Sequence, residues 1–325
     1  MSYKKLSGIT GFSVSTISKA FSQSSEISES TRAKIYSAAR EMGCFDKYYK
    51  EKYKKRIIAV ICPELQSRYI ALITELVLHE LRQNGFLVLL SASDFNPERE
   101  AEFVEYYALY AKVDAIILVT PTVKKIKKYS IPVVAIGSHM ENADEVYIDL
   151  ERAIYDAVKL LKDNGHKRIA FIGEKLTIGK ETSFCNAADR LNISVPSQFI
   201  VRSNERFEAA GRSGADYLMS LDNAPTAIIT AYDYIAIGAI HFLKSKKFKI
   251  PDDVSVIGMD DIADSQNITP TLSSIRTFAE DAVSTAVDII IKKINNPYFK
   301  VTQKTSAGAE FIQRDSVGKC INNKK

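Results

Sequence analysis

Hydrophobic and polar residues alternate with two different periods in the part of the chain that follows residue 56. Short runs of β-branched and other apolar residues are separated by longer stretches with helical periodicity. The runs predict strands at Ile57–Cys62, Phe86–Ser91, Ala115–Thr120, Val133–Gly137, Arg168–Gly173, Ala227–Thr230 and Val254–Gly258, and the stretches predict helices that include Ile70–Asn84, Glu98–Ala111, Glu151–Asn164 and Ile235–Lys246. Such alternation favours right-handed crossovers. We therefore expect an α/β fold with two doubly wound parallel-sheet subdomains.

The first 43 residues show helical periodicity alone, in three short pieces. A helix is expected from about Lys4 to Thr10, and Gly11 then supplies the left-handed backbone that a tight turn requires. A second helix is predicted over Ser13–Phe21 and a third over Ser28–Gly43, each beginning at a serine that is well placed as an N-cap. This spacing is typical of a helix-turn-helix unit.

The second of these helices has two distinct sides. Ile17 and Phe21 lie on its apolar side, together with an alanine, and are expected to pack into a small core. Ser15, Thr16 and Lys19 lie on the other side, where their size and polarity suit contact with base edges. The alternative interpretation of this side is an ordinary solvated helix surface.

Charge separates the N-terminal segment from the rest of the chain. The 325 residues carry a net charge of +5, but residues 1–56 hold twelve Lys/Arg against five Asp/Glu, and the remaining residues hold two more acids than bases. A polyanion is the natural partner of such a segment. A solvated basic tail is the simpler explanation, but a tail lacks the apolar periodicity seen here.

Composition excludes several other classes of protein. Hydrophobic residues make up 46% and charged residues 26%, which are ordinary globular values, and the length fits two or three compact units. No apolar run is long enough to cross a bilayer, and no apolar stretch follows the N-terminal residues. Four cysteines and four histidines are scattered without metal-ligand spacing. We expect a cytoplasmic protein with reduced thiols and no metal or cofactor.

The segment Thr10–Phe21 followed by Ile27–Arg32 resembles the DNA-binding headpiece of the LacI/GalR family of bacterial transcription regulators. The resemblance implies that the second helix enters the major groove and that six residues contact DNA. Val14, Ser15 and Lys19 would face bases, and Ser13, Thr16 and Thr31 would lie near phosphates. Lys19 replaces the usual arginine of the family and lacks its bidentate fork, so we expect a different or less stringent half-site.

Residues 45–56 occupy the place of the family's hinge but depart from its pattern. In the family this segment becomes a helix on DNA and inserts a leucine into the minor groove. Here a stretch of lysines and tyrosines replaces that signature, and Tyr53 stands at the wedge position. Two interpretations stay open besides minor-groove stacking by Tyr53: contact along the DNA backbone, and a flexible charged linker without base contact.

The resemblance continues to the C-terminal part, so that it covers essentially the whole chain. It rests on Pro63 with Ser67–Tyr69, which looks like the family's first effector loop, and on four blocks, Gly165–Ile169, Pro225–Gly238, Ile250–Ile262 and Pro270–Ile275. It implies a periplasmic-binding-protein-like core. Its expected organisation is a headpiece over residues 1–44, a basic hinge over 45–56 and a core over 57–325. Within the core, the first subdomain would comprise residues 57–148 with 278–298, and the second would comprise 149–275 with 300–315.

The resemblance also implies a small-molecule effector, usually a sugar or sugar phosphate, in the cleft between the subdomains. Carried over by position, its contacts would be Ser67, Tyr69, Lys180, Tyr232 and Asp260, with Arg206 and Phe207 as further wall residues. Aromatic faces and a carboxylate that accepts paired hydroxyls suit a polyol. The tyrosines have a second interpretation as core aromatics, Lys180 as a solvated helix residue and Asp260 as a cap of backbone amides.

Two enzyme interpretations have weaker support. Gly173–Lys180 is similar to a phosphate-binding loop, but five residues separate its glycines instead of four, and Glu181 stands where a hydroxyl must reach the metal. The pairs Asp252–Asp253 and Asp260–Asp261 have no accompanying nucleophile motif. We therefore expect no catalytic site.

The sequence predicts a homodimeric repressor that binds a pseudo-palindromic operator and responds to a small-molecule effector, with no membrane partner. A cytoplasmic sensor whose headpiece has lost specific DNA binding is the alternative, because the hinge and position 19 are atypical. The dimer surface is expected around Leu65 to Leu81.

Overall fold

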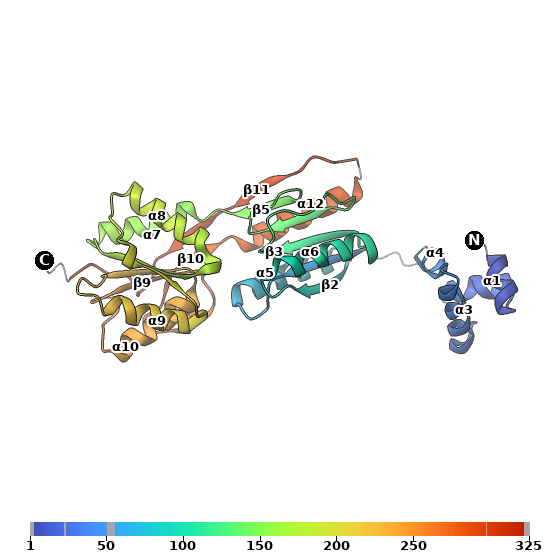
Figure 1. Ribbon diagram of the computed structural model, residues 1–325, viewed down its shortest axis with the longest axis horizontal. Helices are drawn as coiled ribbons and strands as arrows, with labels where there is room; N and C mark the ends of the chain where they lie inside the picture. Colours follow the sequence, from blue (N-terminus) through green and yellow to red (C-terminus); the bar gives the residue numbers. More distant parts are fainter. Residues whose placement is uncertain (1–2, 23, 51–55, 297, 322–325) are drawn as a thin grey trace. The chain divides into compact units, whose positions relative to one another are not determined.

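The structure is a computed structural model that describes residues 3–22, 24–50, 56–296 and 298–321 (Figure 1). The chain divides into two compact units. The first comprises residues 1–56 with 85–87, and the second comprises residues 57–84 with 88–325. Within the described ranges, no helix is long and apolar enough to cross a membrane.

The first unit contains the three predicted helices and one more. They are α1 (Tyr3–Thr10), α2 (Val14–Phe21), α3 (Glu29–Glu41) and the short α4 (Phe45–Lys50). Ser13 and Ser28 are the N-caps of α2 and α3, and their side chains accept hydrogen bonds from the amides of Thr16 and Thr31. Gly11 has a φ of 71°, which confirms the left-handed turn between α1 and α2.

A small core holds the helices of this unit together, and it includes α4. Leu6, Ile17 and Ile35 are fully buried in it. The ring of Tyr48, on α4, lies 4.3 Å from that of Tyr3 and 5.5 Å from that of Phe21, measured between centroids. Aromatic side chains at this spacing add to the stability that burial provides.

The prediction that the headpiece ends at residue 44 and that a linker begins at 45 therefore needs correction. Phe45 and Tyr48 lie on the inward side of α4 and pack against the core, because their rings bury too much apolar surface to remain in a solvated tether. Tyr53 and the other residues of 51–55 lie outside the described residues, so its place on DNA stays a prediction.

Replacing Ser28 with alanine is expected to lower the unfolding free energy of the first unit by about 1 kcal/mol. Its Oγ accepts a hydrogen bond of 3.2 Å from the Thr31 amide, which has no partner within the helix. Urea unfolding followed by tyrosine fluorescence measures this change. Ser37→Ala, an exposed position later in α3, is the matched control, and equal stability of the two variants would contradict the capping role.

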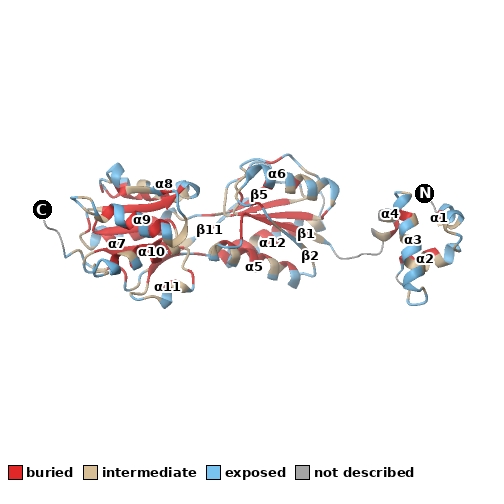
Figure 2. Ribbon diagram, turned by 60° about the horizontal axis from the view of Figure 1, so that its bottom comes forward, coloured by how far each residue is buried: buried red, intermediate tan, exposed pale blue. Residues whose placement is uncertain are grey.

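The second unit contains two six-stranded sheets. The first sheet has the order β11-β5-β4-β3-β1-β2. Its strands are β1 (Ile57–Cys62), β2 (Leu87–Ala92), β3 (Ala115–Val119), β4 (Val133–Ile136), β5 (Asp144–Ile148) and β11 (Lys304–Ala307). Helix α6 (Pro97–Glu105), continued by the π-helical turn Tyr106–Tyr110, covers one face, and α5 (Arg68–Gln83) and α12 (Ala279–Asn295) cover the other (Figure 2).

The second sheet has the order β12-β10-β9-β8-β6-β7, and only β12 runs antiparallel to its neighbour. Its strands are β6 (Ile169–Glu174), β7 (Ile200–Ser203), β8 (Ala227–Thr230), β9 (Ser255–Met259), β10 (Ser273–Thr277) and β12 (Ala309–Ile312). Helices α7 (Glu151–Asp163) and α8 (Ile178–Arg190) lie on one face, and α9 (Phe207–Met219) and α10 (Asp233–Ser245) lie on the other (Figure 1). Short helical turns occur at Lys175–Thr177, Ser197–Phe199 and Asp264–Asn267, the last being α11.

The seven predicted strands are all present, with ends that differ by one residue or less, and the α/β class is confirmed. Five further strands lack a continuous apolar run, and β10 reads Ser-Ser-Ile-Arg-Thr although its first three residues are buried. The range 300–315, predicted for the second subdomain, is shared between the sheets. Its β11 pairs with β5 in the first sheet, and β12 pairs with β10 in the second.

Strand order determines where a ligand binds in each sheet. In the first sheet β1 lies between β2 and β3, and in the second β6 lies between β7 and β8, so the winding direction reverses at β1/β3 and at β6/β8. Open α/β sheets bind ligands at the carboxyl ends of the strands beside such a switch point. The loops that follow β1, β3, β6 and β8 are therefore the first place to look for a site.

Candidate functional site

A cavity of about 430 Å³ lies at the carboxyl ends of the strands of both sheets in the second unit. The first subdomain contributes residues that follow β1, β3 and β4, and the second contributes residues that follow β6, β8 and β9. The polar and aromatic residues that line it are Ser67, Tyr69, Phe95, Thr120, Thr122, Lys124, Ser138, Glu174, Lys175, Thr177, Lys180, Arg206, Phe207, Tyr232, Asp260 and Thr277. Its volume suits a ligand the size of a sugar.

The structure brings all five predicted effector-binding residues together in this cavity. Ser67 is the N-cap of α5, and its Oγ accepts a hydrogen bond of 3.5 Å from the amide of Ile70. The Tyr69 hydroxyl donates to Thr277 Oγ1 at 3.1 Å and so joins the first subdomain to the second. Contact between these residues and an effector stays a prediction.

Lys180 and Asp260 form an ion pair inside the cavity. The Lys180 ammonium lies 2.9 Å from Asp260 Oδ1 and also donates to the Ala231 carbonyl oxygen at 2.7 Å. Helix α8 carries the lysine, and the loop after β9 carries the aspartate. The solvated-helix interpretation of Lys180 and the amide-capping interpretation of Asp260 are both wrong for this structure, because each side chain is committed to the other.

Tyr232 connects the cavity wall to a second carboxylate. Its hydroxyl donates to Glu174 Oε1 at 3.0 Å and accepts from the amide of Phe207 at 3.0 Å. Burial raises the pKa of Tyr232 well above its usual value, and the charge of Glu174 adds to the shift. The phenol therefore stays protonated at neutral pH and keeps donating.

Arg206 forms the strongest connection between the subdomains. Its Nη1 and Nη2 donate to the two carboxylate oxygens of Glu64 at 2.9 and 2.7 Å. Glu64 follows β1 in the first subdomain, and Arg206 precedes α9 in the second. The hydrogen bonds to Glu64 raise the pKa of Arg206, so the guanidinium is permanently charged.

Glu64 and Glu174 were not among the predicted site residues. Both stand directly at the carboxyl end of a strand, Glu64 two residues after β1 and Glu174 as the last residue of β6. Counting carboxylates at strand ends would have identified them, because a charged residue directly after an apolar run seldom belongs to the core.

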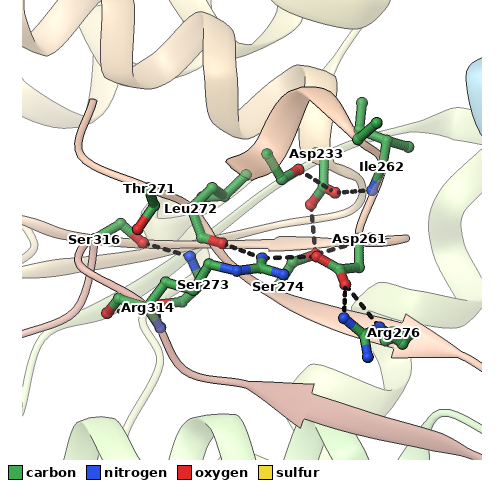
Figure 3. Close-up of polar contacts among 12 residues, drawn as sticks. Asp233, Asp261, Ile262, Thr271, Leu272, Ser273, Ser274, Arg276, Arg314 and Ser316 are labelled. Carbon is green, nitrogen blue, oxygen red and sulfur yellow. Dashed lines mark hydrogen bonds and ion pairs between the residues drawn. The ribbon is translucent and has the colours of Figure 1, made fainter. Parts of the chain in front are cut away.

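Asp261 anchors the loop that presents Asp260. Figure 3 shows its carboxylate, which is 2% exposed, between two arginines. Arg276 Nη2 lies 2.8 Å from Asp261 Oδ2, and Arg314 Nη1 lies 2.6 Å from Oδ1. Asp260 and Asp261 have φ values of 98° and 48°, in the left-handed region of the backbone. This conformation costs non-glycine residues conformational energy, which contacts with the surrounding structure must offset.

Asp233 holds the same loop from the other side. Its Oδ2 accepts from the Ile262 amide at 2.8 Å and from Ser265 Oγ at 2.7 Å, and its Oδ1 accepts from Ser274 Oγ at 2.6 Å (Figure 3). Burial raises the pKa of Asp233 to about 7, and the charge of Asp260 adds to the rise. The buried carboxyl therefore titrates near neutral pH.

Asp233 should make the stability of the protein depend on pH. Its pKa is higher in the folded state than in the unfolded state, so the folded state binds more protons between about pH 4 and 7, and the unfolding free energy falls as pH rises through that window. We expect Asp233→Asn to reduce this dependence by up to ~1.4 kcal/mol per pH unit. Urea unfolding at a series of pH values measures it, and an unchanged slope would contradict the assignment.

Four of the six predicted DNA contacts lie at the start of α2, Lys19 lies in its last turn, and Thr31 lies at the start of α3. Val14 and Ser15 are exposed, and Lys19 is half-exposed on the same side of α2. The three residues predicted near phosphates are Ser13, Thr16 and Thr31. The hydroxyls of Ser13 and Thr16 share a hydrogen bond of 2.8 Å, and Thr31 Oγ1 accepts one of 2.9 Å from the Ser28 hydroxyl.

Lys19 forms an ion pair with Glu26, in the turn that follows α2. Both side chains are largely exposed, so the pair contributes little to stability and exchanges readily for another anion. Arg32 supports this turn from α3, because it donates to the carbonyl oxygens of Ala20 at 2.9 Å and Ser24 at 3.0 Å. Arg32 thus supports the turn after α2, while Lys19 can exchange Glu26 for another anion.

The loop similar to a phosphate-binding loop has another role. Gly173–Lys180 runs from the end of β6 into the first turn of α8. Its residues Glu174 and Lys180 line the cavity. In the described part of the chain, no group of three or more His, Cys, Asp or Glu side chains is arranged to hold a metal ion.

Comparison with known proteins finds similar proteins, among them a transcriptional repressor. Residues 158–317 match the family described as "Periplasmic binding protein-like domain". The chain is 26% identical to Catabolite control protein A of Priestia megaterium, over 87% of this chain and 89% of that protein. It is 28% identical to the HTH-type transcriptional repressor CytR of Escherichia coli K12, over 81% of each.

Solved structures agree on the fold. The transcription regulator CcpA of Lactococcus lactis superimposes with a TM-score of 0.69 at 23% identity and covers 81% of this chain and all of that chain. A LacI family transcriptional regulator from Enterococcus faecium, solved with bound ribose, superimposes with a TM-score of 0.69 at 21% identity and covers 81% of this chain and 99% of that chain.

Proposed function

We propose that this chain is a transcription regulator of the LacI/GalR family, a homodimeric repressor whose affinity for a pseudo-palindromic operator changes when a carbohydrate effector enters the cavity. It is a sequence-specific DNA-binding regulator modulated by a small molecule. The observation that carries the proposal is the meeting of Ser67, Tyr69, Lys180, Tyr232 and Asp260 in one cavity, in a chain that also has a helix-turn-helix unit.

Regulation requires the effector to bind two states of the protein with different affinity. A coupling free energy of about 1–3 kcal/mol between the effector and DNA is typical. The cavity is lined by both subdomains, and the Tyr69–Thr277 and Glu64–Arg206 contacts join them. A ligand that displaces or tightens these contacts changes how the subdomains pack, which is the differential interaction that coupling needs.

Two-fold symmetry supports a dimer, because one helix-turn-helix unit contacts too few base pairs for specificity. The surface proposed for the dimer is the region of Leu65 to Leu81. Leu65 and Leu72 are 51% and 42% exposed there, whereas Ile73 and Val77 of α5 are buried within the unit. Sedimentation at micromolar concentration tests this, and Leu72→Lys is the variant expected to dissociate the dimer.

Selection of bound sequences from a random double-stranded DNA pool tests the function. The full-length chain at near-physiological salt should recover one palindrome, with affinity at least about a thousandfold above that for random DNA. Recovery of random sequences whose binding disappears as salt rises would instead favour the alternative, a sensor with a degenerate headpiece. The relatives are regulators and not enzymes, which also argues against catalysis.

Asp260→Ala is expected to weaken the effect of effector on operator binding about tenfold, because it removes a charged hydrogen-bond acceptor from the cavity. The test is operator release measured with a panel of neutral sugars such as D-ribose and D-glucose. Operator affinity without sugar should not change. Asp252→Ala, in an exposed turn before β9, is the control, and a normal response of the Asp260 variant would refute the cavity assignment.

A further inference from the structure

Lys180 and Arg206, the two least exposed cations that line the cavity, are already paired with carboxylates. Lys180 is paired with Asp260 at 2.9 Å. Arg206 donates two hydrogen bonds to Glu64, and its Nε lies 3.5 Å from Glu174 Oε2. Each of these two cations thus already has a carboxylate partner before any ligand is present.

The Nη atoms of Arg206 are occupied, and its Nε has no hydrogen-bond partner among the described residues. Its guanidinium carbon lies 4.9 Å from the centroid of the Phe95 ring and 4.5 Å from that of Phe207. Glu64 occupies the edge formed by Nη1 and Nη2. That edge is the one that phosphate or carboxylate groups use for bidentate recognition.

The negative charges are buried, whereas the remaining cations are exposed. The side chains of Glu64, Glu174 and Asp260 are 11%, 7% and 9% exposed. Lys124 and Lys175 also line the cavity, but they lie at its exposed rim, where solvent and salt screen them. The buried cations of the lining, Lys180 and Arg206, are therefore the ones that already have carboxylate partners.

The lining also includes hydroxyl groups, which carry no charge. Thr120 Oγ1 is buried and has no hydrogen-bond partner among the described residues. It follows β3 and lines the cavity opposite the second subdomain. A hydroxyl can both donate to and accept from Thr120, and it adds no charge to the wall.

We propose that the effector is a hydroxylated molecule without negative charge, either neutral or bearing a protonated amine, and that Glu64 determines this specificity by occupying Arg206. Sugar phosphates and sugar acids are excluded because their anionic group would have to displace Glu64 and lie beside Glu174. This inference rests on the proposed function, since it takes the cavity to be the effector site.

Inorganic phosphate is the probe that tests it, with titration calorimetry on the full chain without DNA. Wild type should not bind phosphate at millimolar concentration. Glu64→Gln should keep the shape of the wall, free the Arg206 edge and tighten phosphate binding at least tenfold. Arg206→Gln added to Glu64→Gln should abolish the gain. Glu205→Gln, an exposed neighbour, is the matched control and should behave as wild type.

Glu174→Gln is the second variant. It should increase phosphate affinity less than Glu64→Gln does, because Glu64 still occupies the edge of Arg206. Phosphate binding by wild type, whether it depends on Arg206 or on the rim lysines, would overturn the proposal. So would the absence of any gain in a folded Glu64→Gln protein, with folding judged by circular dichroism. Operator selection is a separate experiment, so failure of the proposed function and failure of this inference are distinguishable.

Discussion

Replacing Asp261 with alanine is expected to lower the unfolding free energy of the second unit by about 3–5 kcal/mol. The carboxylate is almost fully buried and pairs with Arg276 and Arg314. Its removal leaves Arg314, which is only 13% exposed, without an opposite charge, and an uncompensated buried charge is among the costliest single changes.

The substitution should also weaken sugar binding in the cavity, because Asp261 anchors the left-handed backbone of the loop that carries Asp260. Urea unfolding of the full chain measures the stability, and titration with neutral sugars measures the cavity. Asp216→Ala, an exposed position on α9, is the matched control and should cost less than about 0.5 kcal/mol. A folded Asp261 variant with unchanged stability would show that the arginines find other partners.

Replacing Lys19 with alanine is expected to reduce discrimination between operator and random DNA about ten- to a hundredfold, which corresponds to about 1–3 kcal/mol. Lys19 is the longest polar side chain on the exposed side of α2, and its pairing with Glu26 is exchangeable. A base contact contributes to the chosen sequence and not to random DNA, so the loss should be selective.

Competition binding with the selected operator and with scrambled duplexes measures this difference. Lys34→Ala, an exposed lysine on α3, is the control, and it should leave the preference for the operator intact. An equal loss of affinity by the Lys19 variant for every duplex would mean that Lys19 contacts phosphate instead of a base. The Lys19 variant would then release about one counterion fewer on binding, which is measured as a shallower dependence of affinity on salt concentration.

Local sequence patterns were sufficient to predict structure wherever burial and helix capping depend on neighbours in the chain. Ser13, Ser28 and Gly11 act at positions that a few adjacent residues define. Six of the seven predicted strands, all except β2, are runs that are buried almost throughout. The five effector positions were carried over from the family's blocks, and strand ends at a switch point meet in one place whatever the intervening sequence.

Tertiary structure alone decided the interactions between distant segments. The pairing of Glu64 with Arg206 spans 142 positions, and β10 is a strand because its serines satisfy buried hydrogen bonds with Asp233 and the residues around Ser316. Helix α4 belongs to the first unit because Tyr48 meets Tyr3 and Phe21. Sequence patterns record the period of apolar residues, whereas the charge partner of a buried group is determined only when the chain has folded.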